Sequence, residues 1–248
     1  IGDSALGFYA RGYSLASLVQ SVLGGAIQAV AAPVFARIRN DRSKIGYGID
    51  FAVGGAIRVA SGLYVFLALT ASDVIHMVYG PMWNDAVPIV QMILPFAVLT
   101  SAQYSLQQIV LIVGSPRILA KIQFIQLSIL ILILWPVLHY WGVIGVSGAV
   151  SFTAVIGTVA FLTALKKYAD FSVLSVLLRP LIGALFGAFI LLVGTSVLEL
   201  EELSRVVRVA FQLAMYGVGF VASVMIFDRS FTMDVIGKFK DAVRPVKN

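Results

Sequence analysis

A single uncharged run, residues 12–36, most strongly limits what this chain can fold into. About 20 apolar residues are enough to cross the hydrocarbon core of a bilayer as a helix. Similar runs recur along the whole sequence, so one buried helix of a water-soluble protein does not explain the pattern. Charged residues make up only 12% of the 248, and the mean hydropathy is +0.97, whereas soluble domains carry roughly 25% charged residues. The sequence therefore predicts an integral membrane protein.

The apolar runs predict an all-α, polytopic transmembrane bundle of about seven spans. Helices are expected because backbone polar groups in lipid must be hydrogen-bonded within their own segment. The run 122–165 is too long for one helix, and we expect it to divide near Gly142, where PVLHYWGVIG supplies a proline, interfacial aromatic residues and a glycine. The predicted spans are 13–35, 51–72, 87–113, 118–138, 143–165, 177–198 and 205–227.

Basic residues alternate between the loops in a way that predicts the orientation of the chain. The loops after the first, third and fifth spans and the C-terminal tail hold most of the 18 lysines and arginines. Cytoplasmic loops carry an excess of Lys and Arg, so we expect a multi-pass protein of the bacterial inner membrane with an external N-terminus and a cytoplasmic C-terminus. The net charge of +6 then reflects topology rather than a nucleic-acid partner. The basic segments are 37–44, 117–121, 166–179 and 229–247.

Residues that could carry catalysis are scarce in this sequence. It contains no cysteine, and its two histidines, His76 and His139, have no partner at the spacing of metal ligands. The carboxylates of the predicted external loops form no specific pair. We therefore predict no enzyme activity, no metal site and no cofactor.

Two glycine patterns have a structural interpretation. Gly142-x-x-Gly145-x-x-Gly148 and Gly183-x-x-x-Gly187 do not lie between a strand and a helix, as a phosphate-binding loop would. Small residues at helical spacing let membrane helices approach closely. We expect these glycines to pack helices together.

Polar side chains within the spans are the remaining candidates for function. The first span carries a stripe of small and polar residues that includes Gln28, and the third carries Gln103, Tyr104 and Gln107 after Pro95, which predicts a kink. Such stripes fit either helix packing with interhelical hydrogen bonds or the lining of a hydrated central cavity. The presence of two stripes together with proline-broken helices favours the cavity.

An arginine inside a predicted span also needs an explanation. Arg58 lies within the second span, where a charge at the bilayer centre costs some 2.5–3.5 kcal/mol on insertion scales. Two interpretations are open. The side chain either extends back to the cytoplasmic interface or lines the cavity.

Three segments resemble a known family of membrane transporters. ALGFYARGYSLASLVQSVLGGAIQAVAAPVFARI is similar to the stretch that enters the family's eighth membrane helix, where a glycine–aromatic–aromatic–small–Arg–small–Tyr pattern leads into a small-residue helix. VYGPMWNDAVPIVQMILPFAVL resembles the Gly-x-x-Trp-x-x-Ala-x-Pro segment that opens the tenth helix, and YWGVIGVSGAV resembles a Gly-x-x-Gly helix start. The family is the Wzx-type O-antigen and exopolysaccharide flippases of the MOP superfamily.

The resemblance implies the C-terminal portion of a fourteen-helix transporter, with the seven spans corresponding to helices eight to fourteen. Residues 1–198 would form the C-terminal transmembrane lobe, and residues 199–248 the last helix with its basic cytoplasmic tail. An N-terminal lobe of the same protein is then expected upstream. The implied function is to move a polyprenyl-pyrophosphate-linked oligosaccharide from the inner to the outer leaflet for surface polysaccharide biosynthesis.

The resemblance also singles out Arg11. In related lipid II flippases an arginine at the matching place points into the cavity and contributes to pyrophosphate binding, so Arg11 is implied as a substrate cation. A guanidinium suits a diphosphate because its planar fork can donate two parallel hydrogen bonds. The candidate cavity residues are Arg11, Arg58, Gln28, Gln103, Tyr104 and Gln107.

Two other functional classes are open at this point. A MATE-like, cation-coupled antiporter of small molecules or drugs would be expected to use a buried carboxylate, and no Asp or Glu lies in the middle of a predicted span. A membrane enzyme acting on lipid-linked sugars would need a large loop or an extra domain with carboxylates, and the predicted loops are short.

Overall fold

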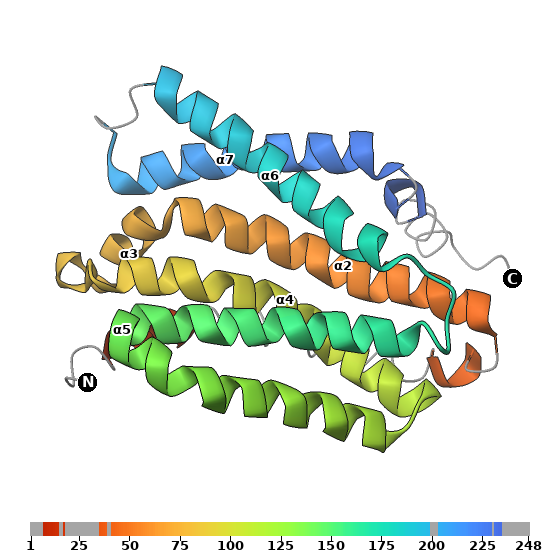
Figure 1. Ribbon diagram of the computed structural model, residues 1–248. Coiled ribbons are helices and arrows are strands. Elements are labelled where there is room, and N and C mark those ends of the chain that lie inside the picture. Colours follow the sequence, from red (N-terminus) through yellow and green to blue (C-terminus); the bar gives the residue numbers. More distant parts are fainter. Residues whose placement is uncertain are drawn as a thin grey trace, which may run out of the picture.

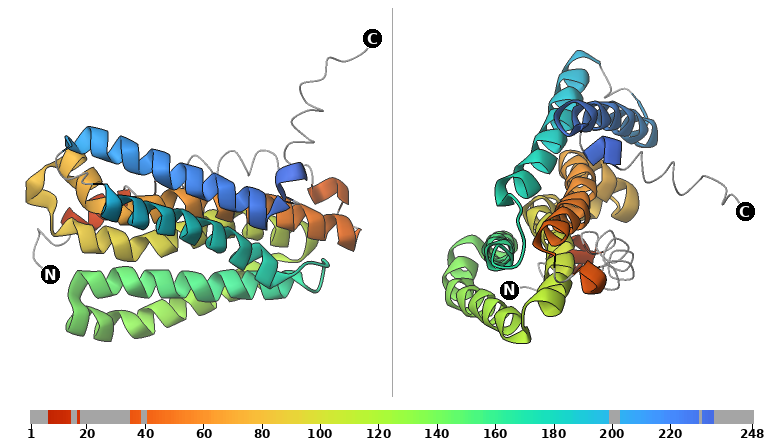
Figure 2. Two further views of the ribbon diagram at one scale, coloured as in Figure 1. Left: turned by 90° about the horizontal axis from the view of Figure 1, so that it is seen from above. Right: turned by 90° about the vertical axis from the view of Figure 1, so that its right-hand side faces the viewer.

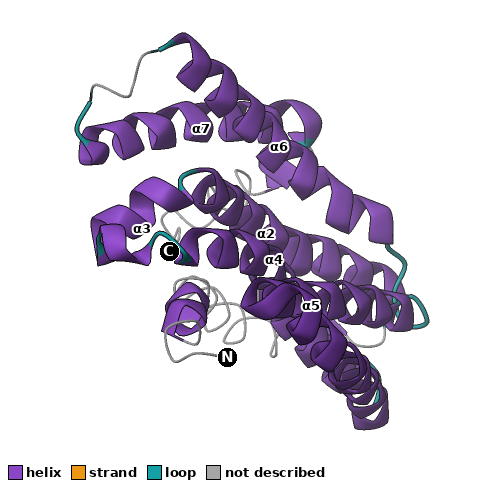
Figure 3. Cartoon of the chain, turned by 60° about the vertical axis from the view of Figure 1, so that its left-hand side comes forward, coloured by secondary structure: helices purple, strands orange, loops and turns teal. Residues whose placement is uncertain are grey.

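The computed structural model describes residues 7–14, 17, 35–38, 41–198, 203–229 and 231–234. Every regular element in this part of the chain is a helix (Figure 3), which confirms the predicted all-α fold class. Five of the helices are long and apolar enough to cross a membrane. The elements are α2 (Arg42–Leu69), α3 (Ala71–Tyr79), the 3₁₀ helix η1 (Pro81–Trp83), α4 (Ala86–Val113), α5 (Pro116–Leu165), α6 (Val173–Val197) and α7 (Arg205–Phe227).

The longest element, α5, consists of two antiparallel arms that lie side by side (Figure 2). The chain reverses at Gly142, whose φ of 59° and ψ of −147° interrupt the helix. A positive φ is accessible to glycine at little steric cost, so the predicted division of the long apolar run at this residue is confirmed. The predicted spans from residue 51 onward thus each correspond to a helix or to one arm of α5. Most of the first predicted span, 13–35, lies outside the described residues.

Two helices begin earlier than the apolar runs predict. The second span was expected to start at residue 51, but α2 starts at Arg42 because Asp41 caps it, accepting a hydrogen bond of 3.2 Å from the backbone N–H of Lys44. Hydrogen bonds from the Lys44 side chain and backbone lower the pKa of Asp41 to about 2, so the cap is ionised at neutral pH. The Ser172 hydroxyl caps α6 in the same way, and that helix begins at Val173 rather than at residue 177.

The expected external loop after the second span is also partly helical. It contains α3 and η1, which are separated by Gly80 with a φ of 90°. The signals in the sequence were Asp73 in the first helical turn and the glycine that ends the helix.

The helices pack in a row rather than around one axis. α5 packs on α4, α4 on α2, α2 on α6, and α6 on α7 (Figure 1). The main core lies between α2 and α4 and the second arm of α5, where Ile57, Ile93 and Phe161 are fully buried. A smaller cluster joins α2 to α6 and α7 around Phe66 and Tyr216. α6 and α7 therefore form a pair attached to one side of the bundle.

Glycines make the close contact between α6 and α7, as predicted. A Cβ at Gly187 would lie 3.0 Å from Cε2 of Tyr216, and a Cβ at Gly183 would lie 3.2 Å from the hydroxyl oxygen of Ser223. That hydroxyl donates a hydrogen bond of 3.2 Å to the Gly183 carbonyl oxygen. The glycine pattern thus allows two backbones to approach, which is its usual role in membrane helices.

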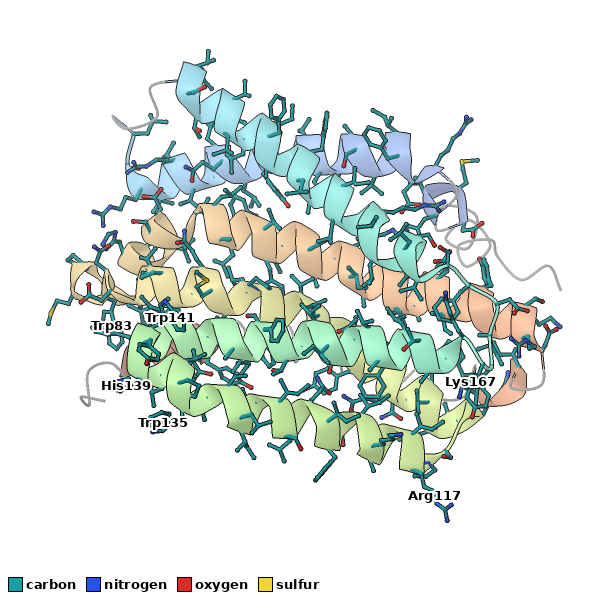
Figure 4. All side chains as sticks on the ribbon, in the orientation of Figure 1. Trp83, Arg117, Trp135, His139, Trp141 and Lys167 are labelled. Carbon is teal, nitrogen blue, oxygen red and sulfur yellow. The ribbon has the colours of Figure 1, made fainter. Side chains whose placement is uncertain are left out.

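The two ends of the bundle differ in their side chains (Figure 4). Arg117 and Lys167 lie at one end, called here the basic end, and the opposite end carries Trp83, Trp135, His139 and Trp141, and is called the aromatic end. Basic residues from two loops that the sequence predicts to be on the same side, Arg117 and Lys167, thus lie at the same end. The assignment of the basic end to the cytoplasm stays a prediction.

Candidate functional site

The polar stripe of α4 is divided between two environments. Gln103 is buried, and its amide nitrogen donates hydrogen bonds to the Ala154 carbonyl oxygen at 2.8 Å and the Thr158 hydroxyl oxygen at 3.1 Å, both on the second arm of α5. This geometry matches interhelical packing, one of the two interpretations that the sequence left open.

Tyr104 and Gln107 form the accessible part of the stripe. They lie one turn apart on α4; the side chain of Tyr104 is 39% exposed and that of Gln107 is partly exposed. Side chains three residues apart on a helix are neighbours, so the pair presents a phenol and an amide on one accessible patch. Gln28, the remaining candidate amide, lies outside the described residues.

Arg11 lies at the aromatic end, on the helical segment 7–14. The central guanidinium carbon is 5.9 Å from the ring centroid of Tyr79 and 6.0 Å from that of Trp83, within the range of a cation–π contact. Phe8 packs edge-on against Trp83 with ring centroids 5.4 Å apart. We call the group Phe8, Arg11, Tyr79 and Trp83 the Arg11 site.

Within the described residues, the Arg11 guanidinium has no ion-pair partner that an anion would have to displace. Arg11 is exposed, and among the described residues no carboxylate lies within ion-pair distance of it. The site is thus chemically suited to a phosphate or carboxylate ligand.

Arg58 forms a buried ion pair that the sequence did not predict. Its side chain is buried between α2 and the end of α7, and its Nε donates a hydrogen bond of 2.6 Å to Oδ2 of Asp228, an oxygen that Nη2 also contacts. The guanidinium carbon lies 4.0 Å from the ring centroid of Phe231. The pair was missed because Asp228 directly follows the last predicted span, outside any apolar run.

A second arginine approaches the same carboxylate. Nη1 of Arg179, on α6, lies 3.8 Å from Oδ1 of Asp228, and the Arg179 side chain is 46% exposed. We call Arg58, Arg179 and Asp228 the basic-end site. The contacts of Arg11 are at the aromatic end and those of Arg58 are with Asp228 and Phe231, so the structure does not bring these two arginines into one site.

The described residues do not suggest metal chemistry. Across the ranges that the structure covers, no three His, Asp or Glu side chains are grouped as a metal site would require.

Comparison with known proteins agrees with the resemblance found in the sequence. Residues 1–88 match the family model described as polysaccharide biosynthesis protein. The fold is similar to that of the lipid II flippase MurJ in an inward closed conformation, with a TM-score of 0.69 over 92% of this chain at 15% sequence identity. The chain spans about half of that flippase, covering 48% of its length. Among curated proteins, none matches the sequence. The structural similarity shows that the two proteins share a helical fold.

Proposed function

We propose that this chain forms the C-terminal part of a flippase that moves a polyprenyl-pyrophosphate-linked oligosaccharide from the inner to the outer leaflet of the bacterial inner membrane. The observation that carries the proposal is the fold similarity to a lipid II flippase over 92% of the chain. The family match over residues 1–88 supports polysaccharide precursors as the cargo. In this proposal residues 1–198 belong to the C-terminal lobe, residues 199–248 form the last helix and tail, and an N-terminal lobe completes the transporter.

The residues support transport rather than chemistry on the sugar. A pyrophosphate-sugar head group must leave water to cross the membrane, so its path needs cations and hydrogen-bonding side chains. Arg11 supplies an available guanidinium, and Tyr104 and Gln107 supply accessible polar groups. In our proposal these three residues line the path of the head group, together with Gln28.

The test is a flipping assay with the full-length protein in proteoliposomes. A fluorescent sugar on a polyprenyl pyrophosphate carrier is placed in both leaflets, and a membrane-impermeant reductant bleaches the accessible leaflet. We expect the bleached fraction to rise from about half towards all of the lipid when the protein is present. Bleaching equal to that of protein-free vesicles would contradict the proposal.

A gene deletion separates this function from the two alternatives. A flippase deletion leaves the finished lipid-linked oligosaccharide in the inner leaflet and removes surface polysaccharide. Loss of the lipid-linked unit itself would instead indicate an enzyme, and normal surface polysaccharide with increased drug sensitivity would indicate an antiporter.

A further inference from the structure

The basic-end site contains hydrogen-bonding atoms that its ion pair does not use. Arg58 is 5% exposed and Asp228 4%, yet Nη1 of Arg58 and Oδ1 of Asp228 are buried without a hydrogen-bond partner. Buried polar atoms in proteins are nearly always hydrogen-bonded, and a charged group left unsatisfied is costly. Nη1 of Arg58 is therefore a free donor within this site. A ligand with more acceptor atoms than the Asp228 carboxylate could accept a hydrogen bond from it.

Gly54 lets that donor lie close against the backbone of α2. Gly54 lies one turn before Arg58 on α2, and a Cβ at this position would be 2.5 Å from Nη1. No side chain could stand there without moving the guanidinium. The unpaired nitrogen thus lies in a place that only glycine leaves free.

The two arginines reach Asp228 from different surroundings. Arg58 approaches from the buried side and Arg179 from the half-exposed side, where its Nη1 is 3.8 Å from Oδ1. A phosphate group has more acceptor oxygens than a carboxylate, and guanidinium groups bind it through paired hydrogen bonds. The arrangement suits a phosphate that enters past Arg179.

The charges nearby also allow Asp228 to be replaced by an anion. Asp50, one turn before Gly54, interacts electrostatically with both arginines and with Asp228. When Asp228 is in place, the two carboxylates balance the two arginines. If Asp228 leaves, Arg58, Arg179 and Asp50 together carry one positive charge, which the negative charge of a lipid phosphate offsets.

We propose that Arg58 and Arg179 form a binding site for the phosphate group of a lipid, and that Asp228 occupies this site when the lipid is absent. The inference rests on the proposed flippase function and extends it to a second phosphate site, distinct from the Arg11 site. Because Asp228 directly follows α7 and Phe231 covers Arg58, lipid binding displaces the segment that follows α7. The phosphate belongs either to the polyprenyl pyrophosphate carrier or to an anionic membrane lipid.

The test measures binding to the full-length protein in a phosphate-free detergent, with thermal stability as the readout. The probes are a polyprenyl pyrophosphate, phosphatidylglycerol and inorganic pyrophosphate. Asp228→Asn is expected to bind a lipid probe about tenfold more tightly than the wild type, because the competing carboxylate is gone. Arg179→Gln, a change at a half-exposed position, is expected to bind it about tenfold more weakly. The lipid that shows this pattern identifies the source of the phosphate.

A matched control removes one negative charge elsewhere at the same end. Asp170→Asn breaks the exposed ion pair with Arg42 and should leave lipid binding unchanged. Equal tightening by Asp170→Asn and Asp228→Asn, response to inorganic pyrophosphate alone, or wild-type binding by Arg179→Gln would each overturn the site. Wild-type binding by Arg179→Gln would contradict the site even if Asp228→Asn does not fold.

The same variants separate this inference from the proposed function. Flipping by the wild type combined with unchanged binding in all variants removes the phosphate site and leaves the flippase. If binding follows the expected pattern but the wild type does not flip lipid, the phosphate site stands and the proposed flippase function is contradicted.

Discussion

Arg42 and Lys167 are 125 residues apart in the sequence, yet Nη1 of Arg42 donates a hydrogen bond of 2.5 Å to the Lys167 carbonyl oxygen. Nη2 of the same arginine also forms an ion pair of 3.1 Å with Asp170. These contacts join the start of α2 to the loop after α5. Two of the loops that the sequence predicts to be cytoplasmic therefore lie together at the basic end.

The first prediction is that the basic end faces the cytoplasm. The chain has no cysteine, so single cysteines can be labelled without a background. Met82→Cys, at an 87% exposed position of the aromatic end, should react with an impermeant thiol reagent in intact cells. Ser43→Cys, next to Arg42, should react only after the cells are permeabilised. The reverse pattern would invert the topology.

The spans were predictable because membrane insertion depends on local hydrophobicity, which any stretch of sequence displays. The early start of α2 was missed because hydropathy does not register an N-cap. The Asp41 cap starts the helix before the apolar run begins. Caps of this kind are visible in the sequence once the helix is known to be there.

The partners of polar residues were less predictable. Helical spacing places Gln103 and Gln107 on nearby faces, but only the packed structure shows that Gln103 meets α5. The Arg58–Asp228 pair joins residues 170 positions apart, and no local pattern encodes such a contact. The sequence therefore located candidate residues without deciding which of them are accessible.

The second prediction concerns Arg11. Arg11→Ala should abolish export of surface polysaccharide while the amount of protein in the membrane stays normal, because the guanidinium is exposed and forms no ion pair among the described residues. Arg11→Lys should be partly active, since it keeps the charge but loses the fork. Arg117→Ala, an exposed position of the basic end, is the matched control and should export normally. Full complementation by Arg11→Ala at wild-type abundance would exclude a role in substrate binding.

The third prediction separates packing from transport on α4. Gln103→Leu removes two interhelical hydrogen bonds and should lower the free energy of unfolding by about 0.6–2 kcal/mol, with export retained. Gln107→Leu should reduce export with little change in thermal stability, because its side chain is partly exposed. Melting temperature and export are measured on both variants. If Gln103→Leu and Gln107→Leu changed melting temperature and export to the same extent, the two residues would act as one unit.

The fourth prediction concerns the buried ion pair. Arg58→Ala leaves Asp228 buried with only the more distant Arg179, which should cost about 3–5 kcal/mol of stability. Replacing both residues, Arg58→Met with Asp228→Leu, should recover most of this loss, because no unpaired charge remains. Thermal melting of Arg58→Met, Asp228→Leu and the double variant completes a mutant cycle. Additive losses would show that the pair is not coupled.

The last prediction tests the glycine contact that joins α6 to α7. At Gly187 a Cβ would lie 3.0 Å from Cε2 and 3.2 Å from the carbonyl oxygen of Tyr216, and the backbone oxygen cannot move without shifting α7. Gly187→Val should therefore separate the two helices and destabilise the protein by about 1–3 kcal/mol. A Cβ at Gly217, on α7, would meet no atom within 4 Å, so Gly217→Val serves as the matched control, with near-normal stability expected. Melting curves in detergent compare the two variants, and equal melting temperatures would show that the close approach of α6 and α7 does not depend on glycine.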